Sequence, residues 1–243
     1  MKVGLHVAIS GQLALYQQME SVAQNVANIT TPGYRADGSR FSALVAKQRP
    51  APVSYVSGRE TYIVTEPGAI KATGNPLDVA LRGDVWMALQ WPDGIVYTRD
   101  GRMRMLPDGR LVSAANGWPV LDVGGAPIAL KPKAGPPQIA ADGMITQNGR
   151  QIGAIGLFRM PEDAKLTRVG NSGVIPNIEP EPVVRFVDAG VIQGFVEESN
   201  VNGAIEMVRL IEMTNAFRQL TSALNDAEEA TLAAIRTLGD PGP

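Results

Sequence analysis

Side chains able to do chemistry are scarce in this chain of 243 residues, and the most promising group is the adjacent pair Glu197 and Glu198. Two carboxylates work as general acid and general base only when both face the same reacting group. Neighbouring residues of an extended backbone point to opposite sides, so this pair is badly placed to work together. We expect one carboxylate to lie at an interface and the other to be solvated.

His6 is the only histidine, and the chain has no cysteine. A lone imidazole gives no multi-histidine metal site, and it completes a Ser-His-Asp arrangement only if its segment folds over a distant domain. The absence of thiols removes disulfides, zinc–cysteine clusters and thiol nucleophiles. Phosphate-binding and dinucleotide-binding fingerprints are also missing. The sequence therefore predicts a protein that is not an enzyme and that has no metal, no cofactor and no small-molecule substrate.

Three tryptophans, Trp86, Trp91 and Trp118, offer another kind of site, a stacking platform for a sugar. Aromatic residues make up only 5% of the chain, so we favour the interpretation that these rings anchor the core of a thin sheet. A secreted β-domain that binds carbohydrate is the alternative, and it requires the three rings to be exposed.

Turn dipeptides divide the middle of the chain. Asp93-Gly94, Asp100-Gly101, Asp108-Gly109 and Asn116-Gly117 recur at intervals of seven or eight residues. Such pairs supply the positive φ that tight hairpin turns need, so the pattern predicts an antiparallel meander. A calcium loop would instead alternate oxygen ligands and end in a carboxylate, which none of these segments does.

Prolines mark the borders of the expected strands. Pro50 and Pro52 indicate an extended connector, and residues 132–137 indicate a loop within the β region. The mostly apolar run at residues 183–187, which follows Pro182, predicts a late strand.

Apolar residues recur at helical spacing near the N-terminus. From Leu5 to Val26 they follow steps of three and four, which predicts an amphipathic helix with a wide apolar face. The helix should end near Asn28, because residues 30–33 read Thr-Thr-Pro-Gly and disfavour helical backbone.

A longer stripe runs from Leu210 to Leu238 near the C-terminus, over four heptads with Thr231 as its one polar member. Asn202 is expected to cap this helix and Gly239 to end it. The alternative is a helix that packs on its own domain, although an apolar stripe that packs within one chain rarely persists for so many turns. A second apolar set widens the face beyond what one partner helix could cover: Ile205, Val208, Ile211, Leu232 and Ile235.

These elements predict a mixed α and β fold. Two long terminal helices pair as a coiled coil, and a central antiparallel β-domain forms a meander or a barrel-like structure. The expected boundaries are an N-terminal helix at 1–33, a connector at 34–67, a β-domain at 68–190, and a strand, turn and long helix at 191–243. A chain with its apolar stripes at both ends is expected to assemble with other chains.

Charge and hydropathy point to no other class of partner. The formal net charge is −2 with both signs interspersed, which argues against nucleic-acid binding. Lys2 and the apolar residues after it have the order of a signal peptide, but His6 interrupts the run and no cleavage site follows. We expect no cleaved signal peptide and no membrane-spanning segment.

Three motifs carry a resemblance to a known family. Residues 23–34, Ala-Gln-Asn-Val-Ala-Asn-Ile-Thr-Thr-Pro-Gly-Tyr, resemble the segment that closes the first helix of bacterial flagellar rod and hook proteins, with Gln24 and Tyr34 as mild departures. Residues 74–83, 97–101 and 108–112 are similar to the β-domain of that family. Residues 193–202 together with 206–208 resemble its entry into the C-terminal helix. The motifs occur in the family's order over nearly the whole chain.

The resemblance implies a structural subunit of the flagellar basal-body rod. The short connector and the Asp84-Val-Trp-Met sequence resemble the proximal-rod type more than the distal-rod type, which is the alternative. Such a subunit would leave the cell through the flagellar export apparatus, cross the periplasm within the rod, and pack with copies of itself and with neighbouring rod proteins. The resemblance and the stripes together give the expected packing residues: Leu5, Ile9, Tyr16, Met19, Ala23, Val26, Asn28, Asn200, Asn202, Leu210, Met213, Phe217, Leu220, Leu224 and Leu238.

Overall fold

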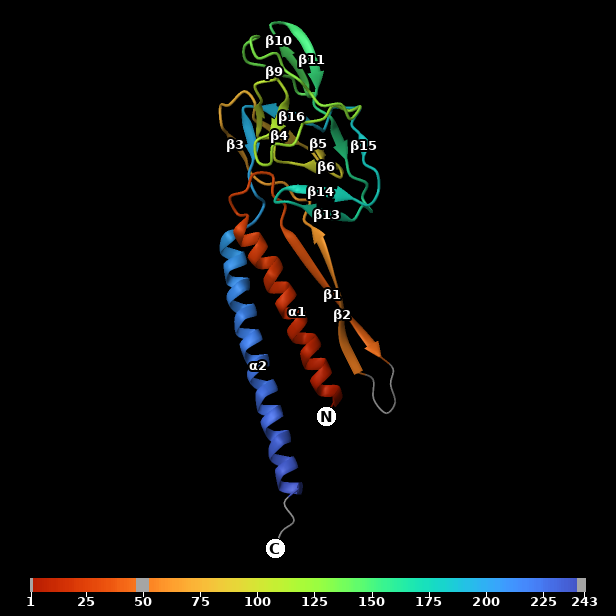
Figure 1. Cartoon of the computed structure of the whole chain (residues 1–243), viewed down its shortest axis with the longest axis vertical. Helices are drawn as coiled ribbons and strands as arrows, with labels where there is room; N and C mark the ends of the chain where they lie inside the picture. The colour runs from red at the N-terminus through yellow and green to blue at the C-terminus, as the bar shows by residue number, and fades with distance from the viewer. Residues whose placement is uncertain (1, 47–52, 240–243) are drawn as a thin grey trace. The chain divides into compact units, whose positions relative to one another are not determined.

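The computed structural model describes residues 2–46 and 53–239, with side chains described for 9–39, 61–227 and 229–233. The chain forms two compact units (Figure 1). The helical unit consists of Met1–Ala27, Asp37–Tyr62 and Asn202–Pro243. The β unit consists of Asn28–Ala36 and Ile63–Val201.

The helical unit contains α1 (Lys2–Ala27), α2 (Gly203–Gly239) and a two-stranded sheet. The strands of that sheet are β1 (Asp37–Ala46) and β2 (Val53–Ile63), which lie within the segment predicted as an extended connector. In the part of the chain that the structure describes, neither helix is apolar over a length that would cross a membrane.

The ends of the helices follow local sequence signals. α1 ends at Ala27, just before the predicted position, and the amide of Thr31 donates to the carbonyl of Asn28 in the turn that follows (3.1 Å). The predicted cap of α2 is confirmed, because the side-chain oxygen of Asn202 accepts a hydrogen bond from the amide of Ile205 (3.2 Å). This bond satisfies one of the free amides that every helix start leaves.

The predicted fold class, a coiled coil of terminal helices beside a meander or barrel, is wrong. The chain is mostly β, and its two helices differ in length, with 26 and 37 residues. They contact each other, and Gln12 donates to the hydroxyl of Thr221 (3.3 Å). A coiled coil buries a continuous seam, but Val22 is the one buried apolar side chain among the described residues of the two helices, and Tyr16 is 60% exposed. The apolar face is too wide for one partner helix to cover.

The β unit is built from short strands in several small sheets (Figure 1). Its largest sheet has the order β13-β14-β6-β5-β12-β15, and a three-stranded sheet has the order β11-β10-β9. The pairs β16-β4, β17-β3 and β7-β8 complete the unit. The strands are β3 (Ile70–Ala72), β4 (Val79–Arg82), β5 (Trp86–Trp91), β6 (Gly94–Thr98), β7 (Met103–Met105), β8 (Leu111–Ser113), β9 (Gln138–Ile139), β10 (Met144–Gln147), β11 (Arg150–Ala154), β12 (Leu157–Arg159), β13 (Leu166–Val169), β14 (Gly173–Pro176), β15 (Glu181–Pro182), β16 (Gly190–Gln193) and β17 (Phe195–Glu197).

Strand β5 separates two apolar cores. Met87 and Leu89 point into the larger core, while Trp86 and Ala88 point into a smaller one that includes Tyr97. Successive side chains of a strand face opposite sides, so a strand buried on both faces is apolar throughout. Trp86 is 1% exposed, which confirms it as a core anchor.

The predicted hairpin turns are confirmed at several positions, although the strands do not form a meander. β5 pairs with β6 across Asp93-Gly94, and β7 pairs with β8 across Asp108-Gly109, where Gly109 has a φ of 93°. At Asp100-Gly101 the glycine serves close packing, because an added Cβ would lie 1.8 Å from the carbonyl oxygen of Val79. Long-range pairings such as β12 with β5 then break the sequential order that a meander requires.

The predicted strand at residues 183–187 is wrong. Pairing stops at β15, where Pro182 lacks an amide hydrogen, and residues 183–187 form a loop. The amide of Val183 donates to the carbonyl of Leu157 (2.9 Å), and the side chain of Phe186 packs against the larger core. The apolar residues of this run therefore divide between the core and the surface.

Candidate functional site

Glu197 lies at the centre of a buried ionic cluster in the β unit. Its carboxylate accepts hydrogen bonds from Arg35 (2.8 Å) and from Arg99 (2.6 Å to Nη2), and the three side chains are only 1–2% exposed. The amide of Gly68 donates to the same carboxylate (3.1 Å). Glu198 points away, is 45% exposed and pairs with Lys71 (3.2 Å). The two carboxylates therefore face opposite sides, as predicted, and do not form a catalytic pair.

Arg99 ties the ionic cluster to the backbone around β4. Its guanidinium donates to the carbonyls of Leu81 (2.9 Å), Gly83 (2.8 Å) and Val85 (2.6 Å), in addition to Glu197. A buried guanidinium is tolerated only when its charge and its donors are matched. Here one carboxylate and three carbonyls supply that match.

Arg35 is less completely matched than Arg99. Its Nε and Nη1 are buried without a hydrogen-bond partner in the structure. Burial, and then the nearby charge of Arg99, lower the pKa of Arg35 to about 10, against the opposing influence of Glu197. Two guanidinium groups thus share one buried carboxylate, which makes Glu197 the residue on which this cluster depends.

Asparagines hold the segments that flank the helices. Within the β unit the side chain of Asn200 accepts from the amide of Ala36 (2.7 Å) and donates to the carbonyl of Glu66 (2.8 Å). Within the helical unit the side-chain oxygen of Asn25 accepts from the amide of Asp37 (2.8 Å). Asn28 accepts from the hydroxyl of Thr31 (3.0 Å). The predicted packing residues Asn28 and Asn200 therefore fix turns within their own unit.

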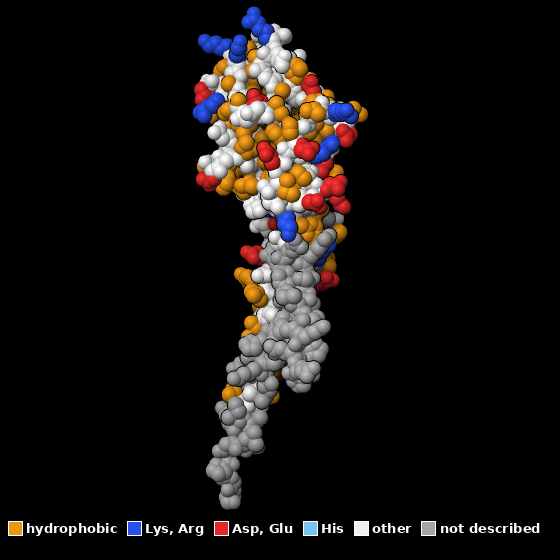
Figure 2. All heavy atoms as spheres, turned by 90° about the vertical axis from the view of Figure 1, so that its right-hand side faces the viewer, with side chains coloured by type: hydrophobic (Ala, Val, Ile, Leu, Met, Phe, Trp, Pro, Cys, Tyr) orange, Lys and Arg blue, Asp and Glu red, His pale blue; other side chains and the backbone are white. Residues whose placement is uncertain are grey.

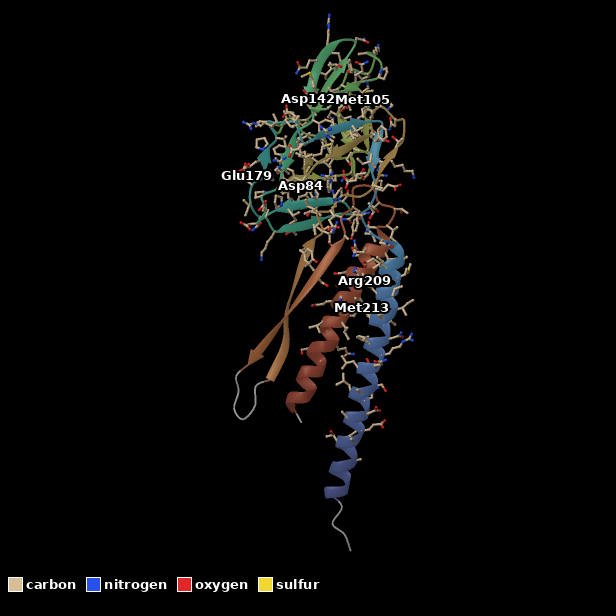
Figure 3. The ribbon with its side chains drawn as sticks, turned by 180° about the vertical axis from the view of Figure 1, so that it is seen from behind. Asp84, Met105, Asp142, Glu179, Arg209 and Met213 are labelled. Atoms are coloured by element: carbon tan, nitrogen blue, oxygen red, sulfur yellow. The ribbon has the colours of Figure 1, made fainter. Side chains whose placement is uncertain are left out.

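The predicted apolar packing residues lie along the two helices, and the structure leaves much of their surface uncovered. Ile9 and Tyr16 are 49% and 60% exposed, and Ala23 is also exposed. The others with described side chains are half-buried, among them Met213, which is labelled on α2 in Figure 3. The half-buried set is Met19, Val26, Leu210, Met213, Phe217, Leu220 and Leu224; Leu5 and Leu238 lie outside the described side chains.

The second apolar set of α2 is more exposed still. Ile205 is 49% exposed, Val208 55% and Ile211 61%, so these side chains form an apolar surface along the first turns of the helix. Scattered apolar residues are normal on a surface, but a continuous stripe marks a contact site.

The described residues show little that could support catalysis. Asp142 lies toward one end of the β unit, away from Asp84 and Glu179 (Figure 3). Among the side chains that the structure places, no three carboxylates or imidazoles come together as a metal site. Trp91 and Trp118 pack against the larger core with ring centroids 6.3 Å apart, while Trp86 is buried in the smaller one. The three tryptophans therefore do not form one exposed sugar platform.

Known proteins resemble this chain both in its C-terminal segment and over nearly its whole length. Residues 192–237, which include Glu197, Asn200 and most of α2, match the family model described as flagellar basal body rod FlgEFG protein C-terminal. The flagellar basal-body rod protein FlgF of Mesorhizobium japonicum is 44% identical and that of Rhizobium meliloti 45% identical, each over 98% of this chain and 99% of the relative. FlgF of Caulobacter vibrioides is 32% identical over 97% of both chains. This chain belongs to the FlgF family of flagellar basal-body rod proteins.

Membership of the FlgF family confirms the resemblance found in the sequence. The motif at residues 193–202 supplies Glu197 and Asn200, whose hydrogen bonds hold the β unit together. The ion pairs of Glu197 with Arg35 and Arg99 could not be predicted from local sequence patterns, because these partners are far apart in the chain. The only local signal was an arginine directly after the Pro-Gly-Tyr turn of the first motif.

Proposed function

We propose that this chain is a structural subunit of the proximal rod of the bacterial flagellum, and that it packs in the rod through the outward apolar faces of its two helices. The observation that carries the proposal is the uncovered stripe on α2, where Ile211 is 61% exposed. Its membership of the FlgF family places the chain in the flagellar basal body.

The exposed stripes explain why assembly is favourable. Burying apolar surface contributes about 25 cal/mol per Å², and the stripes of α1 and α2 extend over several helical turns. Within one subunit neither helix covers the other completely. Several neighbouring subunits around each helix can cover the whole face, and a contact between unlike surfaces that does not close produces a helical array.

The packing residues of this proposal are those on the described helix faces: Ile9, Tyr16, Met19, Ala23, Val26, Leu210, Met213, Phe217, Leu220 and Leu224, with Val208 and Ile211 added because of their exposure. Leu5 and Leu238 extend the same stripes in the sequence. Asn28, Asn200 and Asn202 have a different role: Asn28 fixes the turn after α1, Asn200 holds the segment before α2, and Asn202 caps the start of α2.

The proposal extends to how such a subunit works. Stacked helices would line the rod and enclose the export channel, and they would give the drive shaft the stiffness needed to transmit torque through the periplasm. The partners would be further copies of this chain, other rod proteins, and the export apparatus that delivers the subunit.

The test uses charged substitutions on the exposed stripe. Val208→Glu with Ile211→Glu should leave the isolated chain folded, because both side chains are exposed there, but should abolish incorporation into basal bodies and motility. Gln219→Glu, an exposed polar position on the same helix, is the matched control and should remain motile. Normal basal bodies and swimming with the double variant would contradict the proposal.

A further inference from the structure

The loop after β15 presents two apolar side chains to solvent in a fixed position. Val184 and Val187 are 83% and 86% exposed. Between and beside them, Val183 and Phe186 pack against the larger core, so the outward valines stand on an anchored loop. Arg159 and Asp188 form an ion pair across its base (3.3 Å). We call Val184 and Val187 with their flanking acidic residues, Glu179 and Glu181, the valine loop.

The valine loop borders a surface hollow that is rimmed by charge. Glu181, Arg185 and Asp188 line this hollow together with the two valines. Glu179 and Glu181 are exposed and form no ion pair in the described residues, while Asp188 is matched by Arg159. The face of the β unit that carries β15 is seen in Figure 2, where acidic side chains lie among apolar ones. Arg185 adds an exposed positive charge between the valines, so a fitting partner would offer small apolar groups to the valines and positive charges to Glu179 and Glu181.

The β unit itself carries a surface with positive charges beside apolar groups, at its end formed by β9, β10 and β11. Figure 2 shows Lys and Arg side chains gathered there, over β9, β10 and β11. Lys131 and Lys133 are exposed on the proline-rich loop 131–137, next to the exposed Pro132 and Pro136. We call this loop, together with Arg150, the basic tip.

The basic tip is held in shape by one buried glutamine. The side chain of Gln147, 3% exposed, accepts from the amide of Lys131 (2.8 Å) and donates to the carbonyl of Gly135 (2.8 Å). Gln147 is also the register partner of Arg150 in the β10–β11 hairpin, which brings that cation to the same end of the unit. None of the three cations forms an ion pair with a described acidic residue.

We propose that the basic tip of one copy of this chain docks on the valine loop of a neighbouring copy in the rod. The prolines of the tip would cover Val184 and Val187, and Lys131 and Lys133 would face Glu179 and Glu181. Because the two surfaces lie at different places on one unit, the contact is heterologous and continues from subunit to subunit.

This contact rests on the proposed rod function and adds a second set of interactions to the helical one. Two valines and two exposed charge pairs are a small interface, far below the roughly 1,200–2,000 Å² of stable complexes. The tip and the loop therefore bind only weakly between free subunits, and they engage when the helices have already brought neighbouring copies together.

Disulfide trapping tests the contact directly, because the natural chain has no cysteine. A chain carrying Lys133→Cys and Val184→Cys should form a ladder of disulfide-linked multimers in isolated basal bodies under mild oxidation. The matched control pairs Lys133→Cys with Val123→Cys, an apolar position that is 60% exposed elsewhere on the β unit, and should give no ladder. Equal ladders from both pairs, no ladder from the first pair, or a disulfide from residue 184 to a different protein would each overturn the proposal.

Charge exchange provides an independent test. The Lys133→Cys/Val184→Cys chain keeps Lys131 as the one lysine of the proposed contact, so Glu179→Lys with Glu181→Lys should lower the ladder yield about threefold, the size expected for one exposed ion pair. Adding Lys131→Glu should restore the yield. If the reversed charges leave the yield unchanged, the proposed pairing is wrong. The presence of the chain in the isolated basal bodies, measured by immunoblotting, separates failure of this contact from failure of the proposed function.

Discussion

In the β unit Leu89, Val96 and Leu111 are at most 1% exposed, whereas in the helical unit Tyr16 and Ile211 are 60% and 61% exposed. The β unit thus completes its own core, while the helical unit leaves apolar surface for other chains to cover. A helix in water depends on such coverage, because propensity alone stabilises it only marginally. The contrast indicates that one unit is folded by its own sequence and the other is completed by assembly.

Hydrogen exchange of the isolated chain should give the largest difference between the two units. Amides of β5 and β6, in the middle of the six-stranded sheet, should exchange about a hundredfold or more slowly than those of α2 around Ile211, since opening of a thinly packed helix costs far less than global unfolding. Mass spectrometry of peptides from both regions measures this directly. Equal protection would mean that the helical unit is complete without partners.

Removing the charge of Glu197 from the ionic cluster should give the next largest effect, a loss of stability of the β unit. Glu197→Gln removes the charge that holds two buried guanidinium groups, and it should lower the free energy of unfolding of the β unit by about 3–5 kcal/mol. Urea unfolding followed by tryptophan fluorescence measures it, because all three tryptophans lie in that unit. The control Glu198→Gln changes an exposed pair and should cost at most about 0.5 kcal/mol. Similar losses for both variants would contradict the central role of Glu197.

Matched leucine truncations sharpen the comparison. Leu111→Ala empties a fully buried site and should cost about 2–5 kcal/mol in the isolated chain, while Leu220→Ala, at a half-buried site, should cost about 1 kcal/mol. In motility assays the order should reverse for chains that remain folded, because Leu220 belongs to the proposed packing face. A larger loss of stability from the Leu220 change would show that α2 is already part of a closed core.

The smallest predicted effect concerns the start of α2. Asn202→Ala removes the side-chain cap on the amide of Ile205 and should lower helix stability by about 1 kcal/mol. Thermal unfolding monitored by far-ultraviolet circular dichroism would detect this loss. Asn215→Ala, at an exposed position within the same helix, is the control and should not destabilise it, because alanine favours the helix interior.

Features that depend on a short segment of the chain were predicted correctly from the sequence. The end of α1 and the cap of α2 follow from residues within one turn of each boundary, and the hairpin at Asp108-Gly109 follows from a dipeptide. The family was also recognisable, because its motifs are contiguous. The coiled coil inferred from the apolar stripes was wrong, because a stripe does not reveal how many partners cover it, and the role of the stripes in packing between subunits stays a prediction.

Long-range partners were beyond local patterns. Nothing near Glu197 in the sequence indicates that Arg99 and Arg35 converge on it, and the pattern therefore predicted an interface residue instead of a core ion pair. The run at residues 183–187 has the composition of a strand, yet Pro182 ends the pairing before it begins. Both the burial of Glu197 and the loop at residues 183–187 depend on tertiary contacts, which local propensity does not contain.

The position of Glu197 also affects when the ionic cluster can form, because its two arginine partners lie 162 and 98 residues earlier in the chain. A chain that emerges from a ribosome or a narrow channel with its N-terminus first must wait for more than four fifths of its length before this carboxylate arrives. Until then Arg35 and Arg99 lack the carboxylate that holds their guanidinium groups in the β unit. The β unit therefore gains its central ion pairs only after most of the chain has emerged.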